Sequence, residues 1–220
     1  MGQEVVSAVL RNDKFETICG FDRLDTGDNN FPVYTDTKLI KETPDVIIDF
    51  SIPVATFKIL DYALEKKIPV VIATTGFNDE ELEKIKEYSK HLKQHLQLLV
   101  PFFRYIRLLI LLSFFPPNFR FILLVQIDAI NKTLNNEKYY EYNRHDKREK
   151  RNPKEIGIHS IRGGNIVGEH TVSFFTETEC FKLTHTAQSR GVFADGSLKA
   201  AEFLVVQDPG FYNMDNIFSK

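Results

Sequence analysis

Polar residues that could bind a ligand follow the ends of three segments that read as β-strands. Asp22 and Arg23 come directly after residues 15–21, Ser51 follows residues 45–50, and Thr74 and Thr75 follow residues 68–73. A carboxylate at such a strand end can bind ribose hydroxyls, and a neighbouring arginine can bind a phosphate. Backbone amides and small hydroxyls suit a planar ring and its ribose. The competing interpretations are a simple turn at Asp22, helix capping by Ser51 and a turn at Gly76.

The first two residues, Met1 and Gly2, stand where a glycine-rich phosphate-binding loop would already be finishing. Such a loop lies between the first strand and the first helix of a dinucleotide-binding fold. Apolar residues recur at helical spacing over residues 5–10, so the chain is expected to begin with an amphipathic helix. We therefore expect the first strand of the sheet to be missing from this sequence.

The elements that would position these residues alternate between strand and helix. Residues 45–50 and 68–73 are short apolar runs rich in β-branched residues, which is typical of strands buried on both faces of a parallel sheet. Helices are predicted from Ser51 or Pro53 to about Lys66, and from an Asn78 cap to about Lys90. This alternation predicts an α/β fold with a doubly wound parallel sheet.

The middle of the chain differs in composition from the rest. Residues 91–127 contain no Gly, Ala, Thr, Asp or Glu, whereas Leu occurs 10 times and Phe 6 times. A buried pair of helices is one interpretation, but core helices usually contain alanine and a polar face with charges of both signs. The segment is better described as a break in composition.

After the break, residues 131–155 are polar and charged, which favours a solvated connection over an anion-binding patch because acidic residues are interleaved with the basic ones. Residues 156–161, 169–175 and 180–186 predict three strands, and residues 193–206 predict a helix. The second part of the chain is therefore expected to be a smaller α+β domain with a mixed sheet.

Composition excludes several classes of protein. Hydrophobic residues make up 43% and charged residues 26%, as in folded globular proteins. A net charge of -2, from 28 basic and 30 acidic residues, gives no support to a nucleic-acid partner. Two cysteines, Cys19 and Cys180, cannot form a disulfide framework or a four-ligand zinc site, so no metal is expected. We see no signal peptide and no membrane-spanning run, and expect a cytoplasmic protein.

Four motifs in order carry a specific resemblance. They are residues 45–51 (DVIIDFS), 73–77 (ATTGF) and 158–172 (IHSIRGGNIVGEHTV), and Ser189-Arg190 with residues 193–197 (FADGS). Together they resemble the 4-hydroxy-tetrahydrodipicolinate reductase family of lysine and diaminopimelate biosynthesis. The resemblance covers residues 1–90 and 128–220.

The resemblance implies a Rossmann-type domain over residues 1–90 and 196–220, incomplete at its start, and a substrate-binding and oligomerisation domain over residues 91–195. It implies reduction of a dicarboxylate substrate with NADH or NADPH, and a tetramer. The implied cofactor-binding residues are Met1, Gly2, Asp22, Arg23, Ala73, Thr74 and Thr75. Ala73 stands where the family has glycine, and Arg162 is implied to lie near the substrate cleft.

The largest departure from the family lies between residues 91 and 128. The family's cofactor loop, its His-His pair and its Lys-x-Asp-x-Pro-Ser-Gly-Thr stretch do not occur there. His91 and His95 are not followed by the lysine and the Ser-Gly-Thr that would hold a dicarboxylate, so we read them as surface histidines. His145, followed by Asp146 and Lys147, only resembles that motif and lies in a charged loop, and we assign no catalytic residue. We expect a reductase of impaired activity whose middle has been replaced, as a shifted reading frame would do. The alternative is an inactive remnant that acts as an oligomerising or interaction protein.

Overall fold

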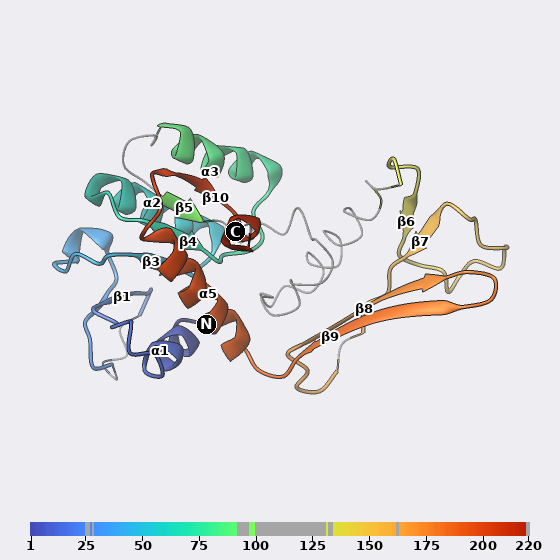
Figure 1. Ribbon diagram of the computed structural model, residues 1–220, viewed down its shortest axis with the longest axis horizontal. Helices are drawn as coiled ribbons and strands as arrows, with labels where there is room; N and C mark the ends of the chain where they lie inside the picture. The colour runs from blue at the N-terminus through green and yellow to red at the C-terminus, as the bar shows by residue number, and fades with distance from the viewer. Residues whose placement is uncertain are drawn as a thin grey trace. The chain divides into compact units, whose positions relative to one another are not determined.

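A computed structural model describes residues 1–24, 27, 29–91, 97–99, 131, 134–161 and 163–218. The chain divides into two compact units (Figure 1). The first unit comprises Met1–Phe102 and Ser189–Lys220, and the second comprises Phe103–Gln188.

The first unit is built from parallel strands and helices. Its strands are β1 (Gly20–Phe21), β2 (Val33–Tyr34), β3 (Ile47–Asp49), β4 (Val70–Ile72), β5 (Gln97–Leu99) and β10 (Gly210–Tyr212). Its helices are α1 (Gly2–Val9), the 3-10 helix η1 (Thr37–Leu39), α2 (Pro53–Lys66), α3 (Asp79–His91), α5 (Gly191–Leu204) and α6 (Met214–Phe218). Strands β1 and β2 form a parallel pair, and a second parallel sheet has the order β10-β5-β4-β3.

Local sequence explains where the two central helices begin and end. Pro53 occupies the first turn of α2, where its missing N–H costs nothing, and Lys67 ends the helix in the left-handed conformation. Asn78 and Glu81 form a capping box at α3: the amide of Glu81 donates to Asn78 Oδ1, and the amide of Asn78 donates to Glu81 Oε2, both at 2.8 Å. The predicted boundaries of α2 and the predicted Asn78 cap are confirmed.

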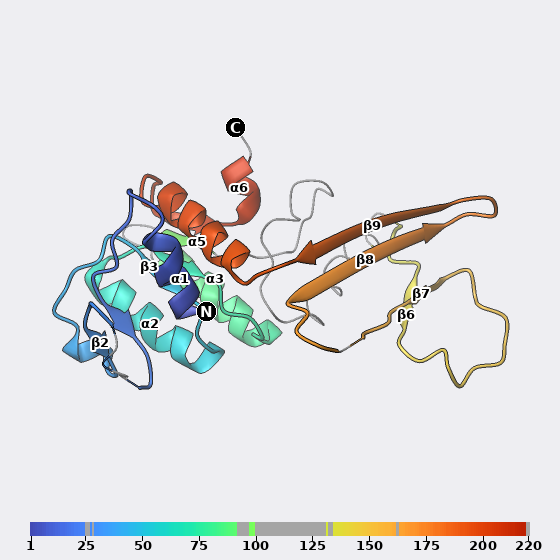
Figure 2. The same cartoon turned by 90° about the horizontal axis from the view of Figure 1, so that it is seen from below.

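The core of the first unit lies between the sheet and helices α2 and α3. Leu60, Val70, Ile72 and Ile85 are no more than 1% exposed and belong to one hydrophobic cluster. A second cluster joins α1 to α5 through Ala8, Ala194 and Leu198, with Ile48 of β3 against it. Figure 2 shows α1 and α5 side by side, as their contacts require. Burial on both faces explains why β3 and β4 read as continuous apolar runs.

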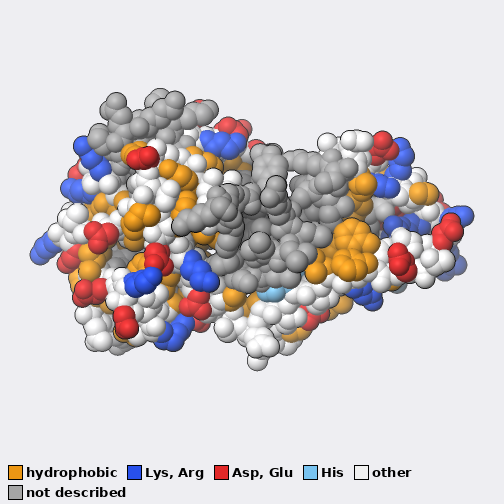
Figure 3. All heavy atoms as spheres, viewed as in Figure 1, with side chains coloured by type: hydrophobic (Ala, Val, Ile, Leu, Met, Phe, Trp, Pro, Cys, Tyr) orange, Lys and Arg blue, Asp and Glu red, His pale blue; other side chains and the backbone are white. Residues whose placement is uncertain are grey.

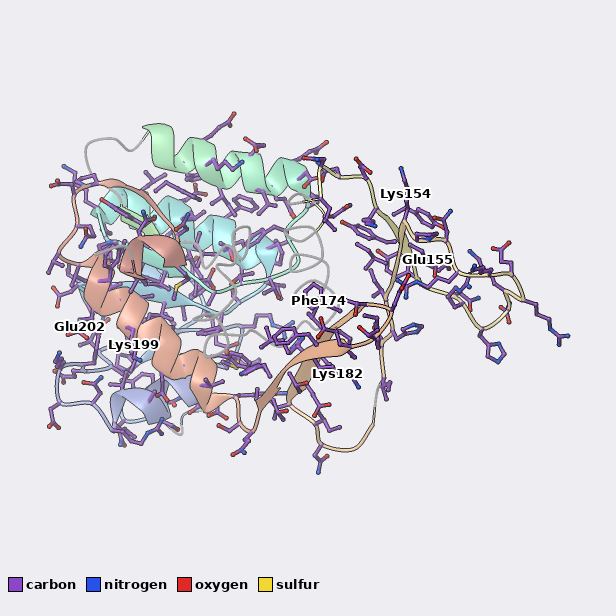
Figure 4. The ribbon with its side chains drawn as sticks, turned by 45° about the vertical axis from the view of Figure 1, so that its right-hand side comes forward. Lys154, Glu155, Phe174, Lys182, Lys199 and Glu202 are labelled. Atoms are coloured by element: carbon purple, nitrogen blue, oxygen red, sulfur yellow. The ribbon has the colours of Figure 1, made fainter. Side chains whose placement is uncertain are left out.

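The second unit contains two pairs of strands among its described residues. Strands β6 (Tyr139–Glu141) and β7 (Glu155–Gly157) are parallel, whereas β8 (Gly168–Phe175) and β9 (Cys180–Ala187) form an antiparallel hairpin. His170, Val172 and Phe174 face the same side as their partners His185, Leu183 and Phe181. Lys182 lies on the opposite, polar face from Phe174 (Figure 4). The hairpin is therefore amphipathic.

Most of the expected elements are found, with four differences. The strand predicted over residues 15–21 is reduced to β1, and the strand predicted over 156–161 is the shorter β7. The predicted connection over residues 131–155 contains β6, which pairs with β7 through the ladder Tyr139↔Glu155. Strands β2, β5 and β10, the 3-10 helix η1 and helix α6 were not predicted, because each is five residues or fewer and shows no periodicity. Apart from His91 and β5, residues 91–127 lie outside the described residues. Among the described helices, none is long and apolar enough to span a membrane.

Candidate functional site

The carboxyl ends of β3 and β4 meet at one edge of the parallel sheet. Their register pairs Ile47 with Val70 and Asp49 with Ile72. Pairing extends one residue past β4, because the amide of Ala73 donates to the carbonyl of Asp49 at 2.7 Å. Ligands of open α/β sheets bind outside such an edge. The structure therefore brings together the two strand ends that the sequence singled out, Ser51 and residues 73–77.

The side chain of Asp49 holds this edge together. Its Oδ1 accepts from the Ser51 amide at 2.8 Å, and its Oδ2 accepts from Thr56 Oγ1 at 2.6 Å and Thr74 Oγ1 at 3.1 Å. The two hydroxyls are 3.1 Å from each other. Asp49 is 2% exposed, Thr56 0% and Thr74 7%. A buried carboxylate needs such donors, because an unpartnered one would be costly.

The loop after β4 is anchored on both sides of its exposed part. Thr74 is bonded to Asp49, Phe77 packs into the core cluster at 8% exposure, and Asn78 caps α3. Between these anchors, Thr75 is half-buried and Gly76 is exposed. Gly76 has φ +92°, a conformation that residues with a side chain rarely adopt, and a Cβ there would meet nothing within 4 Å. The Thr75-Gly76 backbone is thus the accessible part of this loop.

Two further candidate positions lie at the start of α1 and the end of β1. Asp22 and Arg23 are exposed, and Asp22 Oδ1 accepts from the Arg23 amide at 2.6 Å. The amide of Asp22 donates to the Tyr34 carbonyl at 3.1 Å, which ties this strand end to β2. Gln3 at the start of α1 donates to Asn29 Oδ1 at 3.1 Å. This contact brings the amino-terminal turn, with Met1 and Gly2, to the loop that follows Asp22.

Sequence reasoning missed Thr56, which completes the group around Asp49. The sequence feature that could have indicated Thr56 is a hydroxyl residue in the first turn of the helix that follows β3, the strand that ends at Asp49. Ala73, which replaces a family glycine, is 7% exposed. Its methyl group is therefore buried in the first unit and does not project from the exposed edge.

The histidines of the second unit fall into two groups. His145 is a surface residue as predicted, with a side chain 95% exposed and its Nδ1 2.9 Å from Asp146 Oδ1. His170 and His185 stack across the hairpin with ring centroids 6.4 Å apart. Burial, and secondarily the charge of His185, lowers the pKa of His170 to about 4, and burial lowers the pKa of His185. Arg162, His95 and the side chain of His91 lie outside the described residues.

Charge and metal-binding capacity bear on which ligands the site could take. Basic and acidic side chains are interspersed over the first unit on the face seen in Figure 3. In the described part of the chain, no three His, Cys, Asp or Glu side chains converge so that they could hold a metal ion. The candidate site at the β3–β4 edge is thus built from hydroxyl groups, backbone amides and one buried carboxylate.

Two family models match the chain in sequence order. "Dihydrodipicolinate reductase, N-terminus" matches residues 1–98, and "Dihydrodipicolinate reductase, C-terminus" matches residues 121–218. Residues 99–120 lie between the two matches, inside the segment of unusual composition.

Several curated relatives are similar over most of their length. The 4-hydroxy-tetrahydrodipicolinate reductase of Caldanaerobacter subterraneus subsp. tengcongensis is 39% identical over 246 aligned positions, covering 100% of this chain and 94% of that protein. The enzyme of the same name from Staphylococcus aureus is 39% identical over 192 positions, covering 79% of this chain and 78% of that protein. The first alignment is longer than this chain of 220 residues, so the relative has residues that this chain lacks.

A solved structure shares the fold. The dipicolinate-bound dihydrodipicolinate reductase from Paenisporosarcina sp. TG-14 superposes with a TM-score of 0.61 at 17% identity, covering 98% of this chain and 94% of that one. The family matches together span residues 1–98 and 121–218, and the identity to curated relatives reaches 39%. The chain belongs to the dihydrodipicolinate reductase family.

Proposed function

We propose that this chain is a 4-hydroxy-tetrahydrodipicolinate reductase of lysine and diaminopimelate biosynthesis that binds NADH or NADPH but has impaired turnover. We assign the reaction class from the full-length similarity to reductases of that name. Residues 1–90 and 196–220 would form the dinucleotide-binding domain, and residues 91–195 the substrate and oligomerisation domain. A biosynthetic role of this kind places the protein in the cytoplasm.

The arrangement of strands supports a Rossmann-type domain. A doubly wound dinucleotide-binding sheet has its strands in the order 3-2-1-4-5-6. Strands β2 and β1 of this chain would take positions 3 and 2 of that sheet, and strands β3, β4 and β5 would take positions 4, 5 and 6. The described strands leave position 1 open, between β1 and β3. Phe21 of β1 and Ile47 of β3 both pack against the same core cluster, which supports assigning the two sheets to one domain.

The cofactor would be held by residues that the structure leaves accessible. Asp22 is exposed and could bind ribose hydroxyls, while Arg23 beside it could bind a 2′-phosphate. Met1 and Gly2 at the start of α1 would lie near the diphosphate, because a helix amino terminus attracts anions. Residues 73–75 would hold the loop against the nicotinamide end of the cofactor, and the exposed part of that loop is Thr75-Gly76. When bound, the nicotinamide supplies a hydride.

The impairment rests on the middle of the chain. Reduction needs cationic groups to hold the two carboxylates of the substrate and an acid to supply a proton. Residues 91–127 contain neither the His-His pair nor the Lys-x-Asp-x-Pro-Ser-Gly-Thr stretch that supplies these groups in the family. We assign no proton donor among the remaining histidines.

Two measurements on the purified chain test the proposal. Fluorescence titration with NADH and NADPH should give dissociation constants in the micromolar range. A steady-state assay with 4-hydroxy-tetrahydrodipicolinate, following oxidation of the nucleotide, should give turnover far below that of an intact relative assayed in parallel. Turnover equal to that of the relative would refute the impairment, and no binding of either nucleotide would refute the cofactor site.

The second candidate function is an oligomerising protein without catalysis, and the hairpin favours it. Its apolar face carries Val172, Leu183, Phe174 and Phe181, of which Phe181 is 58% exposed. A second copy of the chain could cover this face, and the family resemblance implies a tetramer. Sedimentation over a range of concentrations distinguishes the candidates when read with the titration. Concentration-dependent assembly without nucleotide binding would favour the oligomerising protein.

A further inference from the structure

We propose that Asp49 is a positioning residue that holds the loops after β3 and β4 in the geometry for nucleotide binding, and that Thr74 acts through Asp49. The inference rests on the proposed function and extends it. Neither Asp49 nor Thr56 is among the cofactor-binding residues that the family resemblance implies, and both are buried beneath the edge at which the nucleotide would bind.

Three segments of chain converge on the Asp49 carboxylate. Ser51 belongs to the loop after β3, Thr56 to the first turn of α2, and Thr74 to the loop after β4. The backbone adds a fourth link, from the Ala73 amide to the Asp49 carbonyl. Thr56 Oγ1 also lies 3.1 Å from Thr74 Oγ1 and 3.5 Å from Ser51 Oγ, so the hydroxyl groups contact one another around the carboxylate. Removing the carboxylate takes away the one acceptor that all three segments share, while the strand ladder stays in place.

Each threonine hydroxyl group has one proton to donate, and this limits the hydrogen bonds that Thr56 and Thr74 can make. Thr56 has one proton, and its 2.6 Å contact with Asp49 Oδ2 is shorter than its 3.3 Å contact with the Ile52 carbonyl. Thr74 donates its own proton to Asp49, whose Oδ2 lies at 3.1 Å and whose carbonyl oxygen lies at 3.5 Å. In either case its hydroxyl is used inside the protein. Thr74 thus serves the site through the loop that it anchors, and direct contact with a ligand falls to Thr75 and Gly76.

The exposed part of the loop after β4, Thr75-Gly76, depends on the hydrogen bond of Thr74 to Asp49. Thr75 and Gly76 lie between two fixed points, the Thr74 hydroxyl on one side and the buried Phe77 ring on the other. Loss of the Thr74 hydrogen bond would let Thr75 and Gly76 move. A ligand would then have to order these residues when it binds, which would lower its affinity.

The test measures loop order and nucleotide affinity in the same variants. Thr74→Val removes the hydroxyl while keeping the shape, Thr74→Ser retains the hydroxyl, and Asp49→Asn replaces one acceptor oxygen by a donor. We expect Thr74→Val and Asp49→Asn each to weaken NADH binding about tenfold, and Thr74→Ser to bind like the parent chain. The double variant should lose no more than the weaker-binding single variant, because both changes remove the same link.

Amide hydrogen exchange supplies the second readout and separates the proposal from the proposed function. Exchange of residues 73–78 should quicken in Thr74→Val and Asp49→Asn, without nucleotide present. Ile85→Val is the matched control: it trims a buried side chain of α3, which is 1% exposed, and should leave both NADH affinity and loop exchange unchanged.

Each outcome decides between the alternatives. Unchanged loop exchange in Asp49→Asn overturns the proposal whatever the nucleotide does, and so does quickened exchange with parental affinity. Additive losses in the double variant would show that Thr74 contacts the ligand itself. If the parent chain binds no nucleotide, the proposed function fails, and the exchange data alone decide whether Asp49 orders both loops.

Discussion

The stability of the hairpin in the second unit should fall as the pH falls, and His170 should be the main cause. Burial lowers the pKa of His170 to about 4 in the folded protein, from an ordinary value of 6.5. The unfolded chain therefore binds a proton more readily than the folded chain. The contribution of His170 to stability is complete above about pH 6.5 and is lost as the pH falls toward 4. His185 opposite has a pKa lowered by burial and acts in the same direction.

The two pKa values set the size of the effect. Between about pH 7.5 and about pH 5, protonation of the unfolded state at this one residue lowers the free energy of unfolding by about 2 kcal/mol. His170 is 5% exposed, so solvent screens its charge little. Replacing it by phenylalanine, which extends the apolar row formed by Val172 and Phe174, should remove that part of the pH dependence.

Urea unfolding at the two pH values, followed by circular dichroism and by hydrogen exchange of residues 168–187, measures the effect. We expect His170→Phe to lose about 2 kcal/mol less than the parent chain on acidification. His159→Gln, which changes an exposed histidine of the same unit, should behave like the parent. If His170→Phe lost as much stability on acidification as the parent chain, the assignment to His170 would be refuted.

Four further predictions concern the first unit. Gly76→Ala should destabilise the protein by about 1 kcal/mol because of its φ of +92°, with no clash to relieve, and thermal unfolding will measure it. Asn78→Ala should cost about 1 kcal/mol by breaking the capping box with Glu81, and Glu81→Gln, which can still reach the Asn78 amide, should cost less in the same urea titration. Leu60→Ala, at 0% exposure, should cost about 2–5 kcal/mol in that titration; a smaller loss would contradict the central position of Leu60 in the core. Arg23→Ala should weaken binding of NADPH more than that of NADH, and equal losses in paired titrations would argue against a phosphate contact.

Several parts of the fold were predictable because their signals are local. The span of α2 followed from Pro53 and the apolar positions of its inner face, and the Asn78 cap from its own side chain with the acidic first turn of α3. The hairpin strands β8 and β9 and helix α5 also agree with the expected segments within a few residues. Such signals lie within a few residues of the element that they define, so no knowledge of distant contacts is needed.

Short strands without alternation were not predictable. Strands β5 and β10 each have three residues and pair with each other across more than a hundred positions of the chain, as in Gly210↔Gln97. Strand β6 lies in a charged segment that favours a solvated loop, and is held by pairing with β7. These strands form because they pair with segments that are distant in the sequence. A window of neighbouring residues does not contain those partners, so it cannot predict the strands.

The sequence by itself determined the α/β class, the polar residues at the strand ends and the motifs that identify the family. It could not tell which of those polar residues face outward. Ser51, Thr74 and Thr75 look alike as small hydroxyl residues after strands, yet only the tertiary structure shows Thr74 turned inward to Asp49 and Thr56. The physical reason is that a buried carboxylate must find hydrogen-bond donors wherever the fold supplies them. Two of its three partners, Ser51 and Thr56, follow it closely in the chain, whereas the third, Thr74, reaches it only because β3 pairs with β4.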